Sequence, residues 1–446
     1  MKNLPLDFLE EMKELLPKDE YDDYILRCEK GFYYRGIRIN TLKCTAEKAT
    51  ELLPFPIEQN PFCSEGYYIP SETEGLGSLP LHHAGAFYAQ EPSAMSAVTV
   101  LDPKPGDKVL DLCAAPGGKS TQIASALEGS GLLWSNEIVK NRANVLLSNM
   151  ERMGVTNAVV SNCHPDMLCR SLAGCFDKVL VDAPCSGEGM FSRDNTAVEE
   201  WSAEHSRSCA VRQLSILESA AEALKEGGTL VYSTCTFSRT ENEDVVEKFL
   251  ALHSEFELED CAVSFGRRSG GKMVRVYPAD GGEGHFAAKM RKKGDLMPTH
   301  TDVCVISSKQ RDLALSFYDE LFSGRPFGDN IEVVGDKVML LPKEGFPAMH
   351  GLGIIRAGLM LGEIKKNRIE PHHSLFMASK KDQLKSFIDL SLDDERIIKF
   401  LKGEEIAIDD SLKGYTAVFV EGIALGFGKA VNGVLKNKYP KGLRMM

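Results

Sequence analysis

Between residues 100 and 250 the chain alternates short apolar, strand-forming runs with segments of helical periodicity. The apolar runs are KVLDLC (108–113), GLLWSNE (131–137), NAVVSN (157–162), KVLVDAPC (178–185) and GTLVYSTC (228–235). Helical patterns cover 138–153 and 208–226, and we expect Gly227 and Gly228 to end the second helix. This alternation predicts an α/β fold in which a mostly parallel sheet carries helices on both faces. In such folds, ligands bind beyond the carboxyl ends of the strands.

The first two strands lead into residues that suit a nucleoside. The segment CAAPGGK (113–119) follows the first strand, and its small residues and glycines let the backbone approach a ligand ahead of a helix with free N–H groups. The second strand ends on Glu137, where an acid suits a ribose diol. The spacing is neither GxGxxG nor a Walker A loop. The pattern predicts a nucleoside-containing cofactor without a pyrophosphate, and the alternative is a tight turn followed by a surface glutamate.

Two of the strands end at a cysteine. Cys185 follows Asp182 and Pro184, and Cys235 ends the last run. An exposed thiolate is a good nucleophile. When a thiolate adds to carbon 6 of a cytosine, carbon 5 becomes electron-rich and attacks an electrophilic methyl group; loss of the carbon 5 proton then expels the thiol. A carboxyl group at the base edge, here Asp182, favours the addition. The pair predicts this chemistry, and the alternative is that both cysteines are small buried hydrophobes.

The composition is that of a soluble protein with several domains in a reducing compartment. A chain of 446 residues exceeds one ordinary core, and its twelve cysteines form no CxxC pair. The segment MKNLPLDFLEEMKELLP predicts an acidic amphipathic helix and not a secretory leader, and no uncharged apolar run approaches twenty residues. We therefore expect a cytoplasmic protein without a membrane span.

The net charge of −12 disfavours a nucleic-acid partner, but the charge is unevenly distributed. Acidic residues are in excess over 1–288, and basic residues are slightly in excess over 289–446. The segment KAVNGVLKNKYPKGLR (429–444) contains five basic residues and no acid. This basic strip can bind phosphates on an acidic protein, and the alternative is a solvated C-terminal edge.

The same segments carry a resemblance. DLCAAPGGKSTQIA, DAPCSGEGMF and YSTCTFSRTENE are similar to the signature motifs of the Sun-type RNA (cytosine-5) methyltransferases, and YAQEPSAM (88–95) and RINTLK (38–43) to flanking blocks of that family. GHFAAKMRKK (284–293), GLMLGEIKKNRIEPHHSL (358–375) and LKNKYPKGLR (435–444) resemble the RsmF-type bacterial 16S rRNA enzymes. The resemblance covers nearly the whole chain. It implies a class I, Rossmann-like methyltransferase fold with S-adenosylmethionine as methyl donor.

The resemblance also implies roles for individual residues. Cys235, in the TC motif, corresponds to the nucleophile, and Cys185, in the PC motif, to the group that helps to break the adduct. Asp182 corresponds to the residue that contacts the target base, and it also borders the cofactor. The acid that holds the adenine falls on Asn162 or Asp166, of which we favour Asp166. The other expected cofactor contacts are Cys113, Ala114, Ala115, Pro116, Gly117, Gly118, Lys119, Glu137 and Arg142.

The segment 186–213, which follows Cys185, is expected to cover the flipped base. In it, Arg193, Trp201 and Arg212 are candidates to bind phosphate or to stack on bases. The alternative for Trp201 is that it anchors the helix that it begins. DNA cytosine-5 methyltransferases lack the TC cysteine, so the presence of both thiols favours RNA.

We expect four modules. They are an N-terminal RNA-binding α+β module (1–90), the catalytic domain (91–293), a small α+β module (308–375) and a PUA-like β module (385–446) with a turn at Asn432-Gly433. The resemblance implies methylation of cytosine carbon 5 in 16S rRNA of the small ribosomal subunit, by a monomer without a metal. The alternatives are the same reaction on tRNA, a non-catalytic RNA-binding assembly factor and a nicotinamide dehydrogenase.

Overall fold

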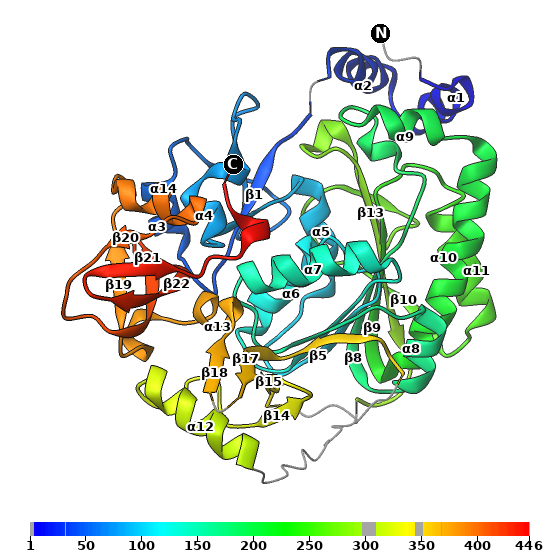
Figure 1. Ribbon diagram of the computed structural model, residues 1–446. Helices are drawn as coiled ribbons and strands as arrows, with labels where there is room; N and C mark the ends of the chain where they lie inside the picture. Colours follow the sequence, from blue (N-terminus) through cyan, green and yellow to red (C-terminus); the bar gives the residue numbers. More distant parts are fainter. Residues whose placement is uncertain (1–3, 32, 297–308, 344–350, 367, 446) are drawn as a thin grey trace.

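The computed structural model describes residues 4–31, 33–296, 309–343, 351–366 and 368–445. A ten-stranded sheet lies at the centre of the molecule (Figure 1). Its strands are β5 (Lys108–Asp111), β6 (Leu132–Asn136), β7 (Ala158–Ser161), β8 (Phe176–Asp182), β9 (Leu224–Thr234), β10 (Phe256–Glu259), β11 (Arg267–Ser269), β12 (Met273–Val276), β13 (His285–Lys292) and β16 (Ile354–Ala357). The order is β11-β12-β13-β9-β8-β5-β6-β7-β16, with β10 paired to β13. The strands from β5 to β9 pair in parallel, which confirms the predicted sheet.

Helices cover both faces of this sheet (Figure 1). One face carries α5 (Ser96–Leu101), α6 (Gly118–Leu127) and α7 (Lys140–Arg152). The other face carries α8 (Pro165–Ser171), α10 (Ala203–Ala223) and α11 (Glu243–Leu252). Between these elements lie η3 (Glu188–Met190), α9 (Asn195–Glu200) and η4 (Pro278–Asp280). No helix within the described ranges combines the length and the apolar character that crossing a membrane requires.

The helix predicted over 208–226 occupies Ala203–Ala223 instead. It begins early because the Ser202 hydroxyl accepts a hydrogen bond from the backbone N–H of His205 at 3.0 Å, which is an N-cap. It ends early because Leu224 already pairs with Phe176 in β8. Gly227, at φ 72°, lies at an irregularity of the β8–β9 register, so the two glycines mark a distortion in the strand and not a helix end.

The residues before the catalytic sheet form two separate parts. The helices α1 (Leu6–Leu15) and α2 (Lys18–Lys30) lie beside α9, and α1 corresponds to the predicted amphipathic helix (Figure 1). The remainder is a four-stranded sheet in the order β2-β3-β1-β4 on another side of the catalytic domain. Its elements are β1 (Gly36–Ile39), α3 (Ala46–Leu52), β2 (Glu58–Gln59), β3 (Gly66–Tyr68), η1 (Leu76–Ser78), α4 (Pro80–His83), β4 (Phe87–Ala89) and η2 (Pro92–Met95).

The first C-terminal module contains a four-stranded sheet in the order β14-β15-β17-β18. Its elements are α12 (Lys309–Leu321), β14 (Ile331–Val334), β15 (Lys337–Leu340), β17 (Leu359–Lys365), β18 (Arg368–Pro371), α13 (His373–Met377) and η5 (Lys381–Gln383). Between β15 and β17 the chain leaves this module and adds β16 to the edge of the catalytic sheet, antiparallel to β7. The backbone N–H of Asn162, just after β7, donates to the carbonyl of Gly353 at 2.9 Å. Residues from the 308–375 segment therefore complete the catalytic sheet.

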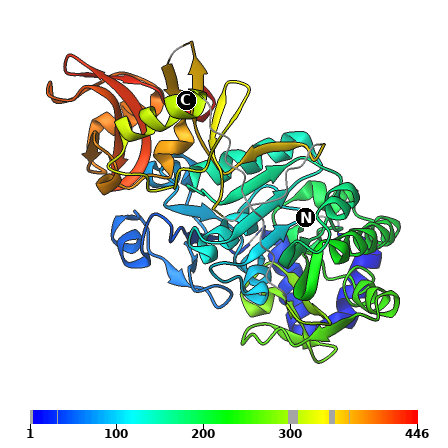
Figure 2. The same cartoon turned by 90° about the horizontal axis from the view of Figure 1, so that it is seen from below.

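The last module is a five-stranded sheet in the order β19-β21-β22-β23-β20. Its elements are β19 (Phe387–Leu390), α14 (Glu395–Lys402), β20 (Ile406–Ala407), β21 (Gly414–Val420), β22 (Ile423–Val431), β23 (Val434–Asn437) and η6 (Lys441–Leu443). Asn432 and Gly433, at φ 49° and 73°, join β22 to β23, so the predicted turn is confirmed. Figure 2 shows both C-terminal modules together on one side of the catalytic sheet.

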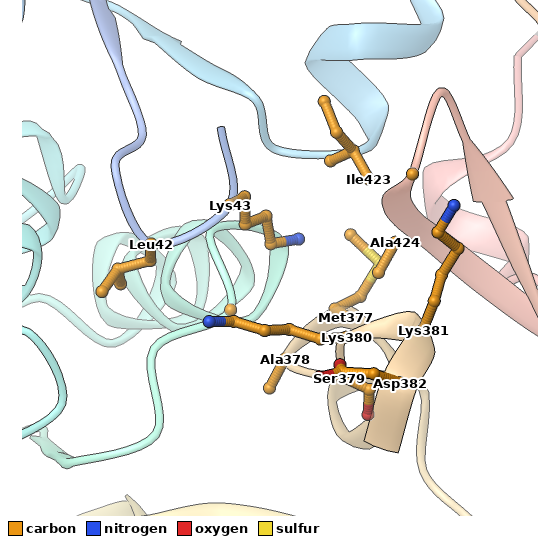
Figure 3. A pocket seen from close by; sticks show the side chains of 12 residues that line it. Leu42, Lys43, Met377, Ala378, Ser379, Lys380, Lys381, Asp382, Ile423 and Ala424 are labelled. Atoms are coloured by element: carbon orange, nitrogen blue, oxygen red, sulfur yellow. The ribbon is translucent and has the colours of Figure 1, made fainter. Parts of the chain in front are cut away.

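The small N-terminal sheet, the catalytic domain and both C-terminal modules meet around one pocket, which we call the junction pocket (Figure 3). Its lining residues are Leu42, Lys43, Gly154, Met377, Ala378, Ser379, Lys380, Lys381, Asp382, Gly422, Ile423 and Ala424. Nearby, the hydroxyl of Tyr439 from the last module lies 2.9 Å from the Nδ1 atom of His83 on α4. The modules are thus joined by polar contacts as well as by the chain.

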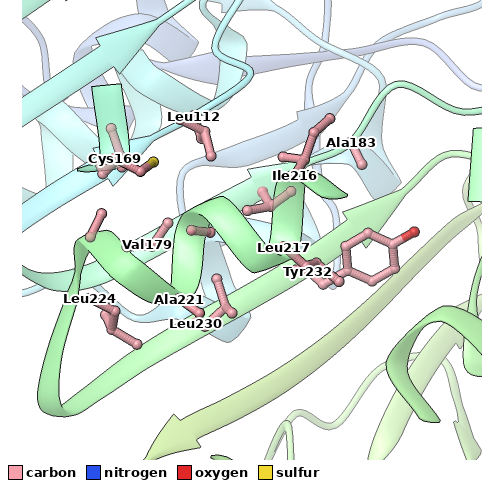
Figure 4. Close-up of a cluster of buried hydrophobic side chains, with 14 of the residues drawn as sticks. Leu112, Cys169, Val179, Ala183, Ile216, Leu217, Ala221, Leu224, Leu230 and Tyr232 are labelled. Atoms are coloured by element: carbon pink, nitrogen blue, oxygen red, sulfur yellow. The ribbon is translucent and has the colours of Figure 1, made fainter. Parts of the chain in front are cut away.

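The main core lies between the catalytic sheet and the helices α8, α10 and α11 (Figure 4). Leu217 and Ala221 of α10 project onto Val179 of β8 and Leu230 of β9, and all four side chains are buried. Apolar residues at helical spacing face apolar residues of parallel strands, which buries both faces of β8 and β9. This packing fixes the carboxyl ends of β8 and β9.

Candidate active site

The carboxyl ends of β8 and β9 bring the two predicted cysteines into contact. The Sγ atoms of Cys185 and Cys235 are 3.4 Å apart, and both side chains are partly exposed. A hydrogen bond from the Cys185 thiol is the main cause that lowers the pKa of Cys235, and the positive charges of Lys119 and Arg193 act in the same direction against burial. The same hydrogen bond, together with burial, raises the pKa of Cys185. The arrangement favours a thiolate on Cys235.

Asp182, the last residue of β8, lies beside this pair and is held by two donors. The Nζ atom of Lys119 lies 2.8 Å from Oδ2, and the hydroxyl of Ser233 donates to Oδ1 at 2.8 Å. Burial opposes the charge on this carboxyl group, but Lys119, together with the hydrogen bond from Ser233, outweighs it and lowers its pKa. Lys119, which we predicted as a cofactor contact, therefore forms an ion pair with Asp182.

Two buried carboxyl groups connect the loops that carry the cysteines. Glu188 follows the first cysteine, and its Oε2 accepts hydrogen bonds from the backbone N–H groups of Phe237 (2.8 Å) and Ser238 (2.9 Å), which follow the second. Conversely, Oε2 of Glu241 accepts from the backbone N–H of Ser186 at 3.0 Å. The sequence reasoning missed both acids. The available signal was their position within the motifs SGEGMF and SRTENE, next to the cysteines.

The structure decides between the two alternatives for Trp201. Its side chain is 7% exposed, and its Nε1–H donates to Oε1 of Glu188 at 2.8 Å. Its ring also packs edge-on against Phe8 of α1, with the ring centroids 5.9 Å apart. Trp201 is therefore an anchor of the segment after Cys185 and not a platform for a base. Arg212 lies exposed on α10.

The expected cofactor residues converge at the ends of β5 and β6. The segment Cys113 to Lys119 connects β5 to α6, and Gly117 takes a φ of 115°, which favours glycine. A guanidinium nitrogen of Arg142 donates to the carbonyl of Ala115 at 3.0 Å, and the other lies 3.5 Å from the carboxylate of Glu137. Glu137 itself is 3% exposed. The structure thus brings Glu137, Arg142 and the glycine segment together.

Of the two candidates after β7, Asn162 is the one that contacts this region. Its side-chain amide donates to the backbone carbonyl of Glu137 at 2.7 Å. Asp166 forms an ion pair with Arg170 on its own helix and lines a surface pocket with Ser215 of α10. The adenine-binding role of Asp166 stays a prediction, with Asn162 as the alternative that the contacts favour.

Two further buried polar side chains lie at this end of the sheet and were not predicted. The Asp111 carboxyl group accepts from the Ser120 hydroxyl at 2.6 Å, its other oxygen has no hydrogen-bond partner, and burial raises its pKa to about 7. His285 lies 3.8 Å from Asp182 with neither ring nitrogen hydrogen-bonded, and burial, followed by Lys119, lowers its pKa to about 3. In the described part of the chain, no three His, Cys, Asp or Glu side chains gather as a metal site.

The sheet order β7-β6-β5-β8-β9, the glycine segment after β5 and the acid after β6 define a Rossmann-like fold of the class I methyltransferase type. The model of the family "16S rRNA methyltransferase RsmB/F" matches residues 98–291. Models of the RsmF N-terminal domain, first C-terminal domain and PUA domain match residues 4–92, 316–378 and 387–445. The last of these agrees with the expected PUA-like β module.

Relatives match over nearly the whole chain. Ribosomal RNA small subunit methyltransferase F of Vibrio vulnificus strain YJ016 is 32% identical over 464 residues, covering 99% of this chain and 97% of the relative. The protein of the same name from Aliivibrio fischeri strain MJ11 is 32% identical over 468 residues, with the same coverage. The chain therefore belongs to the RsmB/F family of 16S rRNA methyltransferases, whose activity is methylation of small-subunit rRNA.

Solved structures support the fold. NSun6 from Pyrococcus horikoshii, solved with SFG, is 25% identical, has a TM-score of 0.58 and covers 66% of this chain and 100% of its own. A methyltransferase homolog protein from the same organism is 30% identical, has a TM-score of 0.54 and covers 65% of this chain and 100% of its own.

Proposed function

We propose that this chain transfers a methyl group from S-adenosylmethionine to carbon 5 of a cytosine in 16S rRNA, through a covalent bond between Cys235 and the base. The observation that carries the proposal is the 3.4 Å contact between Cys185 and Cys235 beside Asp182. A non-catalytic assembly factor needs no such pair, and a nicotinamide dehydrogenase needs no thiol whose pKa is lowered by a second thiol.

The residues at the ends of β5 and β6 fit S-adenosylmethionine, which supplies an electrophilic methyl group when it is bound. Glu137 offers a carboxylate to a ribose diol, and the buried, unpartnered oxygen of Asp111 can accept a hydrogen bond from a cofactor donor. Asn162 and Asp166 are the two candidates to hold an adenine amino group. The related NSun6 structure contains SFG, an analogue of S-adenosylmethionine, which supports the choice of cofactor.

In the proposed reaction, the Cys235 thiolate adds to carbon 6 of the cytosine. Asp182 bonds to the base edge and favours the addition, while Lys119 and Ser233 keep its carboxyl group oriented. Carbon 5 then takes the methyl group. Removal of the carbon 5 proton breaks the bond between carbon 6 and sulfur, and Cys185, whose sulfur is 3.4 Å away, assists this release.

The different roles proposed for Cys185 and Cys235 can be tested directly. We expect Cys185→Ala, expressed in cells and isolated under denaturing conditions, to carry RNA attached at one cytosine, because addition proceeds and release stalls. The matched control is the double variant Cys185→Ala/Cys235→Ala, which lacks the sulfur that forms the bond and should carry none. Sequencing of the attached RNA identifies the substrate.

Each outcome is informative. An adduct on 16S rRNA supports the mechanism and the substrate together. An adduct on tRNA would keep the chemistry and overturn the substrate. Absence of any adduct, with binding of S-adenosylmethionine intact, would contradict the roles of the two cysteines.

A further inference from the structure

The junction pocket contains a partly buried lysine, Lys43, that has no acidic partner among the described residues. Its Nζ atom donates to the backbone carbonyls of Ala84 (2.8 Å) and Arg152 (2.9 Å). An ammonium group has three donors, so one N–H remains for another acceptor. No carboxylate of the described residues pairs with Lys43, and burial, followed by the charge of Arg152, lowers its pKa well below the usual range. The pocket is lined by this side chain (Figure 3).

A second basic residue, Arg152, is also partly buried and contacts Lys43 through its backbone carbonyl. The guanidinium of Arg152 donates to the backbone carbonyls of His82 (2.9 Å) and Phe87 (3.2 Å), so it too is bound by carbonyl groups. Burial and the charge of Arg152 lower the pKa of His82 to about 3, and burial with a contribution from Lys43 lowers that of His373 to about 3. Both imidazoles are therefore neutral. Neither Lys43 nor Arg152 pairs with a carboxylate among the described residues, and an anion bound beside Lys43 would favour its charged form.

Further lysines surround the opening. Lys380 and Lys381 line the pocket, and Lys381 also pairs with Asp389 at 2.6 Å. Lys48 lies at the same edge, because a Cβ atom on Gly422 would lie 3.3 Å from its Nζ atom. Asp382 is the one acid among the lining residues. The lysines come from the N-terminal sheet module and from the first C-terminal module, so they form one site only when these modules are assembled.

We propose that the junction pocket binds one phosphate group of the RNA backbone, with the remaining N–H of Lys43 at its base and Lys380 and Lys48 at its rim. A phosphate offers several acceptor oxygens and negative charge, and no carboxylate of the described residues supplies these to Lys43 or Arg152. The RNA identity of the ligand rests on the proposed function. Binding there would fix the RNA to the point where the modules meet, away from the two cysteines, and so align the substrate with the catalytic domain.

The central test adds a carboxylate to the pocket. Ala378 lines it at the end of α13, and Ala378→Glu gives Lys43 an internal counter-ion that competes with phosphate. Ala378→Gln is the control of the same size without charge. We expect Ala378→Glu, compared with Ala378→Gln, to bind 16S rRNA with a salt slope smaller by about 0.7 to 0.9, the value of one phosphate contact. The slope is read from binding of an in vitro transcript at several KCl concentrations, without S-adenosylmethionine.

Rim variants provide a second comparison. Lys380→Gln and Lys48→Gln should each reduce the salt slope, whereas Lys248→Gln, an exposed lysine on α11, should leave it unchanged. Equal slopes for Ala378→Glu and Ala378→Gln, or equal effects of the three lysine variants, would overturn the proposal. Because the experiment measures RNA binding and not methylation, it remains valid even if the proposed roles of the two cysteines are wrong. Failure of the wild type to bind 16S rRNA would instead refute the proposed function.

Discussion

At the scale of single residues, the site depends on which of two touching thiols carries negative charge. Lys119 connects the thiols to Asp182, because its ammonium group pairs with that carboxylate and also lowers the pKa of Cys235. A single side chain therefore favours the ionised form of both the nucleophile and the group expected at the base edge.

We predict that Lys119→Met slows methyl transfer by about 10²-fold or more and moves the rate optimum to higher pH, because the pKa values of Cys235 and Asp182 rise when the ammonium is lost. Single-turnover methylation at saturating S-adenosylmethionine, measured across pH, checks this. Lys104→Met, at an exposed lysine paired with Asp102, is the control. A slower rate with an unmoved pH profile would contradict the electrostatic role.

The stability of the fold should depend on pH through the buried carboxyl group of Glu283. Glu283 accepts a hydrogen bond from the backbone N–H of Tyr34 at 2.6 Å and another from the hydroxyl of Ser192, and burial raises its pKa from 4.5 to about 7. The folded chain therefore binds this proton between about pH 4.5 and pH 7 while the unfolded chain releases it. The contribution of Glu283 to stability accordingly falls as pH rises through this window.

Glu283→Gln removes the ionisation, keeps the hydrogen bond from Tyr34, and replaces the bond from Ser192 by one in which the amide NH2 donates to the Ser192 hydroxyl. We expect its free energy of unfolding, relative to wild type, to increase by up to about 3 kcal/mol between pH 4.5 and pH 7.5, which is the cost of a shift of about two and a half pKa units. Urea unfolding at both pH values measures it, with Glu10→Gln, at an exposed carboxyl group, as the control. A difference that does not change with pH would show that Glu283 titrates as an exposed acid.

At the scale of elements, the helix pair α1–α2 supports the loop that follows Cys185. Phe8 of α1 is fully buried, with its ring 4.8 Å from Phe191 and 5.9 Å from Trp201. Trp201 in turn donates to Glu188, which binds the loop after Cys235. Through Phe8 and Trp201, the N-terminal helices are thus connected to the loops that follow Cys185 and Cys235.

We therefore predict that Phe8→Ala destabilises the docking of α1–α2 by about 3–5 kcal/mol, the usual cost of removing a buried Phe side chain. Amide hydrogen exchange over residues 4–31 should accelerate, and methylation should slow because Glu188 loses its rigid partner. Leu6→Ala is the matched control, because Leu6 lies in the same helix and is 76% exposed. Equally slow exchange in Phe8→Ala and Leu6→Ala would mean that contacts other than those of Phe8 hold α1 and α2 in place.

The elements also show how far the sequence reasoning reaches. Hydrophobic periodicity located the strands β5 to β9, because each apolar run is a local feature of the sequence. It misplaced α10 because the helix start depends on the Ser202 cap and its end on pairing of Leu224 with Phe176, a contact 48 residues away. It gave no sign of β16, which pairs with β7 through three of its four residues across nearly two hundred positions. The two cysteines were located because their sequence motifs are specific. Glu188 and Glu241 were missed because a single sequence does not show that an acidic side chain is buried.

At the scale of the whole molecule, polar contacts join the four modules to one another, which the division of the sequence into four domains did not predict. One of these contacts involves the predicted basic strip over 429–444, because Lys438 forms an ion pair with Glu370 at 3.3 Å, whereas Arg444 donates to the carbonyl of Tyr439 within its own module. All four lysines of the strip are nevertheless exposed, namely Lys429, Lys436, Lys438 and Lys441. Phosphate binding by the strip therefore stays a prediction beside the junction pocket.

The contacts of strand β16 allow a direct test of whether the first C-terminal module stabilises the catalytic domain. Its Arg356 lies 2.7 Å from the carboxylate of Glu151 on α7, and the two side chains are only 10% and 20% exposed. Arg356→Ala leaves Glu151 buried without its partner, and burial already raises the pKa of that carboxyl group. Removing one member of a buried pair costs about 3–5 kcal/mol, because the remaining charge is uncompensated.

We expect urea unfolding, followed by tryptophan fluorescence, to report this loss for the catalytic sheet itself, since Trp134 is fully buried in β6. Lys365→Ala, which breaks exposed pairs with Glu363 and Asp336, should cost less than about 1 kcal/mol. The double variant Arg356→Ala/Glu151→Ala should recover part of the loss, because no unpaired charge remains. If Arg356→Ala behaved like Lys365→Ala, β16 would be an appended edge, and the first C-terminal module would be independent of the sheet that carries the active site.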